Sequence, residues 1–273
     1  MLSENKKVSR PQNQTSVFIK RKRTFTLVFL CTMAIFIGSS YVTEFNIVDS
    51  FTSIPGAIIW IVKNLVPNEA SWPRIPVILS SLSETALMSI AVTVCAAICA
   101  FLFSLLGTRT TKVNPVIGRG VRIIAAFFRN VPDVAWALIL LLSFGQNILT
   151  GFFALFFASF GLLTRTFIET IDEISASCVE ALYATGATSL QIVFRGIIPS
   201  SMAALVSWVL YMVETNIRNA TLIGILTGTG IGFWFDIFYK RSDFGAVSLV
   251  VVAIVVLVIA IELTSTQIRK VIL

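Results

Sequence analysis

The chain is 273 residues long, and 56% of its residues are hydrophobic whereas only 13% are charged. A soluble fold cannot hide that much apolar surface, so the composition excludes a soluble globular protein and indicates an integral membrane protein. The formal net charge of +7 could suggest a nucleic-acid partner, but the basic residues lie beside apolar runs, where membrane insertion explains them.

Six windows are apolar enough to cross a bilayer as helices, since a span needs roughly 20 mostly apolar residues. None alternates apolar and polar residues as the strands of an outer-membrane barrel do. The predicted class is therefore all-α, a polytopic membrane protein with about six transmembrane helices. The windows are residues 25–42, 85–106, 134–149, 152–168, 197–213 and 244–263.

The positions of the basic residues predict the orientation of these helices. A run at residues 20–23 precedes the first window, and Arg109, Arg119 and Arg122 follow the second, so both flanks are expected in the cytoplasm. Counting through the remaining windows places both termini there. The first window could also be read as a cleaved signal peptide, but its apolar stretch is longer than a usual signal core, which favours a retained helix.

This orientation divides the chain into three segments. Residues 1–24 form a basic, disordered cytoplasmic tail, and residues 25–76 hold the first helix and an extracytoplasmic segment with one apolar helical face. Residues 77–273 form the transmembrane core, which contains a polar loop at residues 172–199.

The polar stretch at residues 172–199 interrupts an otherwise apolar sequence and is expected in the cytoplasm. Its first part shows helical spacing of apolar residues and predicts an amphipathic helix. Gly186 can take a left-handed conformation and predicts a turn, followed by a second short helix near Ser189 that Pro199 closes. Such a helix pair would present itself to another protein. The apolar positions of the first helix are Ile174, Cys178, Ala181 and Leu182.

Two Arg–carboxylate pairs stand four residues apart near window boundaries. Arg129 and Asp133 flank Pro132, and they form either an interfacial ion pair that secures a bend or a wall of a translocation path. Glu214 and Arg218 flank Asn216, and they form either a satisfied pair that holds two helices or part of a water-filled path. Both readings stay open for each pair.

A glycine-rich segment follows the second pair, with Gly228, Gly230 and Gly232 among its residues. It is too broken for an ordinary span, and irregular backbone at membrane depth must be covered by protein or water. A re-entrant or tightly packed element beside the pathway is therefore expected. Whether residues 219–239 cross the membrane stays open at this point.

The chain is not expected to be an enzyme. It has no histidine and no phosphate-binding GxxxxGK[ST] loop, so it lacks the commonest general base and that route to ATP hydrolysis. Cys95 and Cys99 are four apart but have no nearby carboxylate to complete a shell, so core packing is favoured over a metal site. No cofactor is expected on this chain, and energy must come from a partner.

The polar stretch resembles the EAA loop of ATP-binding cassette (ABC) importer permeases. Its Glu, Gly and Pro spacing is intact in Glu180, Gly186 and Pro199, whereas Leu182 replaces an alanine and Gly196 an aliphatic residue. The resemblance implies the type I importer fold, in a bacterial plasma (inner) membrane, and a coupling helix that docks on an ATPase subunit. The residues implied in coupling are Glu180, Ala181, Thr185, Gly186, Ala187 and Pro199.

Three further runs, FRNVPDVAWALILLLSFG, ETNIRNATLIG and LTGTGIG, resemble the permeases of phosphonate importers over roughly residues 80–270. This implies transport of phosphonate or a related phosphorus oxyanion, although related branches carry phosphate, phosphite or methionine. An ion-coupled secondary transporter is a weaker alternative, because it would usually show paired broken helices in matching halves. The residues expected along the path or gate are Arg129, Asp133, Glu214, Asn216, Arg218, Gly228, Gly230 and Gly232.

The same resemblance implies a set of partners. They are an ABC ATPase in two copies that binds ATP and Mg, a second permease chain as a homodimer, an extracytoplasmic substrate-binding protein and the lipid bilayer. No nucleic acid is expected among them.

Overall fold

The computed structural model describes the backbone of residues 13–110 and 114–272, and the regular structure within them is entirely helical. The all-α prediction is thus confirmed. The chain divides into two compact units, Met1–Ile61 and Val62–Leu273, and each is considered by itself.

The first unit holds helix α1 (Asn13–Val42) and most of helix α2 (Ile47–Asn64). The predicted disordered tail is wrong for residues 13–24, which form the first turns of α1, and the rest of that tail lies outside the described residues. The stretch Ile19–Val42 is long and apolar enough to cross a membrane. Asn46 starts α2, because its side-chain oxygen accepts from the backbone N–H of Val48 at 3.0 Å.

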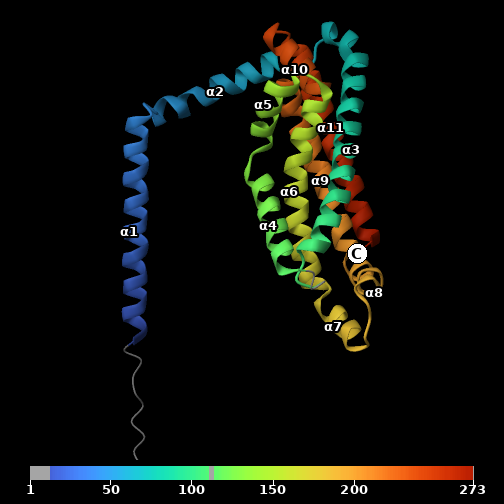
Figure 1. Cartoon of the computed structure of the whole chain (residues 1–273). Helices are drawn as coiled ribbons and strands as arrows, with labels where there is room; N and C mark the ends of the chain where they lie inside the picture. The colour runs from blue at the N-terminus through green and yellow to red at the C-terminus, as the bar shows by residue number, and fades with distance from the viewer. Residues whose placement is uncertain (1–12, 111–113, 273) are drawn as a thin grey trace, which may run out of the picture. The chain divides into compact units, whose positions relative to one another are not determined.

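The second unit is a bundle in which α6 (Ile148–Ile174) packs against four other helices (Figure 1). Half of the most apolar stretch of α6 is buried, the largest share among the candidate spans. Its neighbours are α3 (Ile75–Gly107), α4 (Pro115–Asn130), α5 (Asp133–Phe144) and α9 (Ile198–Thr227).

The remaining elements lie at the two ends of this bundle or along its side (Figure 1). One end, called the α7 end below, carries α7 (Ala176–Ala184), α8 (Ser189–Ile192) and the last residues of α3. The opposite α10 end carries α10 (Gly230–Lys240) and the short 3-10 helix η1 (Glu69–Arg74). Helix α11 (Phe244–Ile272) runs back and brings the C-terminus to the α7 end.

Five helical stretches in the described residues are long and apolar enough to cross a membrane, and a bent pair, α4 with α5, is the sixth candidate. The bounds predicted for the third span, residues 134–149, are wrong, because α5 has only 12 residues, about 18 Å of helix, and α4 supplies the rest of the crossing. The pair bends by 88° beside Pro132, which cannot continue a backbone hydrogen-bond ladder.

The bent pair nevertheless extends from one end of the bundle to the other (Figure 1). At the α7 end, Arg122 of α4 donates to the carbonyl of Gly107, the last residue of α3. At the α10 end, Gln146 after α5 donates to the carbonyl of Leu226 near the end of α9. With the bent pair counted as one crossing, the predicted number of about six spans is confirmed.

The fifth predicted span, residues 197–213, is too short. Helix α9 has 30 residues and continues to Thr227, so Glu214 and Arg218 lie within it and not at its boundary. Helix α10 has only 11 residues, about 16 Å, and is too short to cross the hydrocarbon layer. Residues 219–239 therefore hold the end of α9 and a short packed helix, with no added crossing among the described residues.

Candidate functional site

A glycine turn at the α7 end joins α7 to α8. Gly186 has a left-handed φ of +77°, its N–H donates to the carbonyl of Tyr183, and the N–H of Ala187 donates to that of Leu182. This pair of bonds is a Schellman motif, which satisfies carbonyls left free at a helix end. The predicted turn at Gly186 is confirmed.

The second short helix is confirmed at Ser189. Thr188 caps α8, and its own N–H donates to the side-chain oxygen Oε1 of Gln191 at 2.8 Å, which completes a capping box. The expectation that Pro199 closes this piece is wrong, because a π-helical segment, η2 (Val193–Ile197), carries the chain directly into α9. Pro199 sits in the first turn of α9, where its missing N–H costs nothing.

The face that α7 buries differs from the predicted one. Val179 is 2% exposed and Leu182 is half-buried, whereas Ile174, Cys178 and Ala181 are exposed. The predicted set followed apolar residue types, but α7 is a new helix that starts after Ser175, so Ile174 belongs to a different axis. The side opposite Val179 is therefore available to another protein.

The structure places the predicted coupling residues around the turn. Glu180, Ala181, Thr185 and Gly186 are exposed, and Ala187 is half-buried. Pro199 is exposed but lies apart from the turn, on α9. Their exposure agrees with a docking surface but does not test it.

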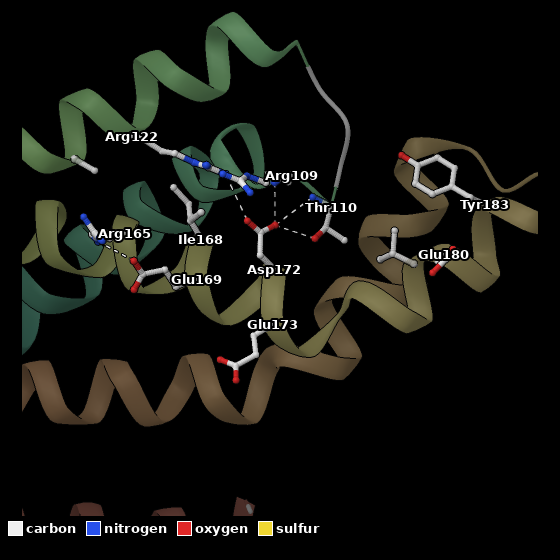
Figure 2. Close-up of a pocket in the computed structure, with 12 residues that line it drawn as sticks. Arg109, Thr110, Arg122, Arg165, Ile168, Glu169, Asp172, Glu173, Glu180 and Tyr183 are labelled. Atoms are coloured by element: carbon white, nitrogen blue, oxygen red, sulfur yellow. Dashed lines mark hydrogen bonds and ion pairs between the residues drawn. The ribbon is translucent and has the colours of Figure 1, made fainter. Parts of the chain in front are cut away.

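A cavity of about 860 Å³ opens beside α7 (Figure 2). On one wall, Asp172 of α6 accepts from the backbone N–H groups of Arg109 and Thr110 at 2.8 and 3.1 Å and from the hydroxyls of Thr108 and Thr110. Arg122 lies 3.5 Å from the other oxygen of the same carboxylate. Asp172 thus ties the segment after α3 and the middle of α4 to α6. The other wall includes Glu180 and Tyr183 of α7.

The sequence analysis missed the second ion pair of this cavity. Arg165 and Glu169 of α6 are joined at 2.8 Å and are 47% and 61% exposed. Arg165 falls inside the predicted fourth span at residues 152–168. A charge inside an apolar window is unusual enough to have marked this wall, since charged residues within spans usually face protein or water.

The predicted Glu214–Arg218 ion pair is formed within α9. The guanidinium Nη1 lies 3.0 Å from Oε1 of the carboxylate, and the two side chains are 13% and 47% exposed for Glu214 and Arg218. Arg218 lies about 14 Å from the nearer end of α9, measured along the helix. A half-exposed arginine at this depth is costly against lipid, so protein or water must cover it in the membrane.

Asn216 points the other way, into the bundle, and is 1% exposed. Its amide nitrogen donates to Thr93 of α3 at 2.9 Å and to Ser159 of α6 at 2.8 Å. These partners lie roughly halfway along their helices. Asn216 therefore links three helices at mid-depth. It was predicted to lie along the path together with Arg218, but the two side chains lie on opposite sides of α9, and a role of Asn216 in the path stays a prediction.

Arg129 and Asp133 do not form the expected ion pair in the described structure, because they lie on opposite sides of the α4–α5 bend. Arg129 is exposed near the end of α4, and Asp133 begins α5. Spacing of four residues brings side chains together only on a continuous helix. A role for either residue in a path stays a prediction.

The three predicted glycines form the joint between α9 and α10. Gly228 and Gly230 have left-handed φ values of +68° and +58°, and a Cβ at Gly230 would collide with Thr85 of α3. At Gly232 a Cβ would strike the backbone of α9, 2.6 Å from the nitrogen of Ile225. The expectation of a tightly packed element is confirmed for this segment, and a role in gating stays a prediction.

Residues 100–272 match the family model described as the binding-protein-dependent transport system inner membrane component. The chain is 28% identical over 256 residues to a putative phosphite transport system permease protein, HtxC, of Stutzerimonas stutzeri, which covers 93% of this chain and 89% of that protein. It is 32% identical over 117 residues to a putative cryptic phosphonate transport system permease protein, PhnE2, of Escherichia coli, which covers 43% of this chain and 96% of that protein.

A third relative, the phosphate-import permease protein PhnE of Mycolicibacterium smegmatis, is 26% identical over 190 residues. That match covers 70% of this chain but spans only 36% of the length of the relative.

Among solved structures, an inward-facing MetNI methionine ABC transporter matches with a TM-score of 0.64 and 21% identity, over 74% of this chain and 99% of the matched one. An amino acid ABC transporter matches with a TM-score of 0.63 and 14% identity, over 72% of this chain and 95% of the other. The expected type I ABC importer permease fold is thus confirmed. The chain belongs to the family of binding-protein-dependent transport system inner membrane components.

Proposed function

We propose that this chain is the membrane-spanning subunit of an ATP-driven importer for a phosphorus oxyanion, either a phosphonate or the related phosphite or phosphate. In this proposal the chain forms the translocation path and hydrolyses no ATP itself. A separate ATPase with ATP and Mg supplies the energy, and an extracytoplasmic binding protein delivers the solute.

The observation that carries the proposal is the exposed helix pair at the α7 end. Its buried side continues into the bundle through one apolar cluster, while Glu180 and Ala181 remain exposed on its outer side. A surface that is rigidly attached to α6 and α9 and open to a partner can pass a rigid-body movement of that partner to membrane-spanning helices. With the α7 end in the cytoplasm, the partner is the ATPase.

A second copy of the chain completes the path in this proposal. Arg218 needs cover at membrane depth, and no described residue of this chain beyond Glu214 offers it an ion-pair partner. If the corresponding faces of two α9 helices line one water-filled path, both arginines are solvated and can attract an anion. The pairing with Glu214 keeps the site from holding the anion tightly, as passage requires.

The choice of solute is supported by the relatives, whose names refer to phosphite, phosphonate and phosphate. An oxyanion of phosphorus also fits a path with an arginine, because guanidinium groups bind phosphate oxygens in a two-pronged geometry.

ATP hydrolysis in liposomes tests the function and the solute together. The complete complex would contain this chain, the ATPase and the binding protein encoded with it, and would receive methylphosphonate, phosphite, phosphate, methionine or no ligand. We expect hydrolysis to rise with one of the phosphorus oxyanions and not with methionine. Stimulation by methionine alone would overturn the solute class, and failure of the chain to assemble with any ATPase would overturn the importer role.

A further inference from the structure

Gly196 is the point at which the polar loop meets the first membrane-spanning turn of α9. It is buried within the π-helical segment η2, between α8 and α9. A Cβ built at this position would lie only 2.8 Å from Cδ1 of Leu182 and 3.6 Å from Cγ2 of Val179. The side chain of Leu182 on α7 therefore occupies the space that any other residue at position 196 would need.

The two sequence departures noted in the polar loop are thus one structural feature. Leu182 is larger than the alanine expected at its position, and Gly196 is smaller than the aliphatic residue expected at its own. Since the two residues contact each other, the bulk that α9 lacks is supplied by α7. Volume is conserved across the contact, which is the kind of exchange that a packed core tolerates.

The backbone carbonyl of Gly196 takes part in a polar contact with Ser200 and Ser175. The hydroxyl of Ser200 donates to the carbonyl of Gly196 at 2.7 Å and lies 2.8 Å from the hydroxyl of Ser175. Ser175 is the residue at which α6 ends and α7 begins, and it is fully buried. Gly196 is therefore held to α7 at both ends of that helix, through Leu182 and through Ser175.

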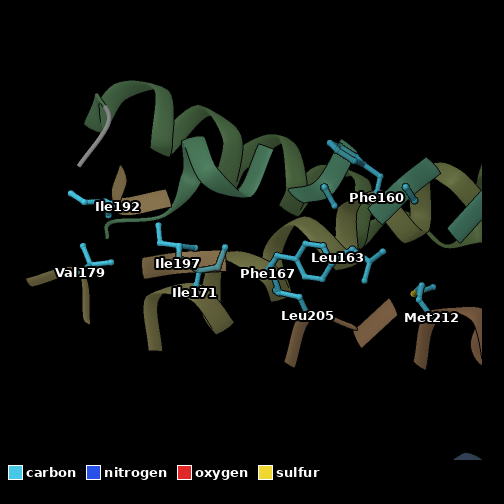
Figure 3. Packing of buried hydrophobic residues seen from close by; sticks show 11 residues of the cluster. Phe160, Leu163, Phe167, Ile171, Val179, Ile192, Ile197, Leu205 and Met212 are labelled. Atoms are coloured by element: carbon cyan, nitrogen blue, oxygen red, sulfur yellow. The ribbon is translucent and has the colours of Figure 1, made fainter. Parts of the chain in front are cut away.

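The contact adjoins a buried apolar cluster that extends along the bundle (Figure 3). Leu182 packs against a cluster that contains Val179 of α7 and Ile197 of η2. The same cluster continues along α6 to Phe160 and along α9 to Met212. Coupling between distant sites travels through such contiguous packing when the elements have discrete arrangements.

We propose that Leu182 is a positioning residue of transport: its contact with Gly196 makes α7 and the start of α9 move as one body. A π-helical turn such as η2 is an irregular and deformable point, and such turns are frequent at functional sites. Without Leu182, α7 could tilt about the Ser175 and Gly186 joints while η2 absorbed the movement. The inference rests on the proposed function, because it concerns how an ATPase movement reaches the path.

Leu182→Ala in the complete complex tests the inference with two readouts. A merely structural role would lower both together, whereas a positioning role lowers only the second. The first is the amount of ATPase that copurifies with the chain, and the second is the amount of solute imported per ATP hydrolysed. We expect unchanged copurification and a fall of about fivefold or more in import per ATP, given the strength of contacts between neighbouring residues. Leu87→Ala, an equal truncation of a 67% exposed residue on α3, is the matched control and should change neither readout.

Three variants keep the test decisive if Leu182→Ala folds poorly. Leu182→Met conserves volume and should keep import per ATP near the wild-type value. Gly196→Ala should reduce it, because the new methyl group forces Leu182 away, and adding Leu182→Ala should restore part of the loss by removing the clash. Gly120→Ala is the control for the added methyl group, because no described atom outside the local backbone of α4 lies within 4 Å of a Cβ built there.

The outcomes separate the inference from the function on which it rests. If the wild-type complex shows no ATP-dependent import of any phosphorus oxyanion, the proposed function fails and the inference falls with it. If the wild-type complex imports but Leu182→Ala imports as much per ATP, or if the effects of Leu182→Ala and Gly196→Ala simply add, the positioning role is overturned.

Discussion

Two glycine turns lie at opposite ends of the bundle, one between α7 and α8 and the other between α9 and α10, and they use glycine for different reasons. At Gly186, between α7 and α8, the φ is left-handed, but no described atom beyond the adjacent residues lies within 4 Å of a Cβ built there. At the second turn, Gly228 and Gly230 are left-handed, and a Cβ at Gly232, in the first turn of α10, would strike the backbone of α9 itself. The first turn is open to a partner, whereas the second is closed by its own chain.

This difference distinguishes a turn that can bind a partner protein from a turn that packs two helices of the same chain together. A helix–glycine–helix pattern occurs at both places in the sequence, so the pattern alone does not distinguish docking from packing. The space around the glycine does distinguish them. Substitution of a glycine in an open turn adds only backbone strain, whereas substitution in a closed turn also disrupts packing. The predictions below are ordered by their expected effect on the free energy of unfolding.

Gly232→Ala should have the largest effect, because the added methyl group meets backbone atoms that cannot rotate away. We expect a loss of about 3 kcal/mol in the free energy of unfolding, in line with strong overpacking of a core. Thermal unfolding of the purified chain in detergent measures it, with Gly120→Ala as control. Equal melting temperatures for the two variants would show that the α9–α10 joint is looser than described.

Glu214→Ala comes next, because it leaves Arg218 without its partner midway between the two turns. The carboxylate is 13% exposed, so we expect a loss of about 2 kcal/mol, as for other hydrogen bonds between charged groups. Glu169→Ala breaks an exposed pair of the same spacing and should cost less than about 0.5 kcal/mol. If both changes lower the melting temperature equally, the Glu214–Arg218 pair is no more buried than the surface pair.

Gly186→Val should cost about 1–2 kcal/mol, because a residue with a Cβ is strained in the left-handed region, although there is room for the side chain. The chain should still insert in the membrane while ligand-stimulated ATP hydrolysis falls. Gly186→Asn, which tolerates this conformation, should retain most of the stimulation. Normal uptake by the valine variant would remove the turn from the coupling role.

Glu180→Ala should leave stability within about 0.5 kcal/mol, because the side chain is exposed. Its effect should appear only in the assembled complex, as a loss of about tenfold in ligand-stimulated hydrolysis, a change of 1.4 kcal/mol in coupling. Glu262→Ala, an exposed glutamate on α11, is the matched control. Equal rates for the two variants would exclude Glu180 from the docking surface.

The sequence predicted the features that depend on local chemistry. Apolar runs predicted the membrane helices, and Gly186 predicted the turn at its correct place because only the local φ decides it. A bend at Pro132 was considered, but α4 was not counted as part of the third span, because its Arg119 and Arg122 were assigned to a cytoplasmic flank. The length of α9 was missed because Glu214 and Arg218 satisfy each other and let the helix continue.

Contacts between distant residues could not be predicted from spacing. Asp172 is the first residue of the predicted polar stretch, but its hydrogen bonds go to residues about 60 positions earlier. Asn216 and Arg218 were grouped by sequence, but they lie on opposite sides of α9. The contact between Leu182 and Gly196 was visible only as two separate departures from a family pattern.

Cross-linking from the α7 end and from the α10 end of the bundle tests most directly whether the open turn is the one that meets the ATPase. Two single-cysteine variants would be made from an active protein without native cysteines. The first replaces Leu190 on α8, which is 72% exposed, and the second replaces Arg241 beside α10, which is also exposed. We predict that Leu190→Cys cross-links to the ATPase in the assembled complex and that Arg241→Cys does not. Cross-linking of the ATPase to Arg241→Cys alone would reverse the orientation and contradict the account.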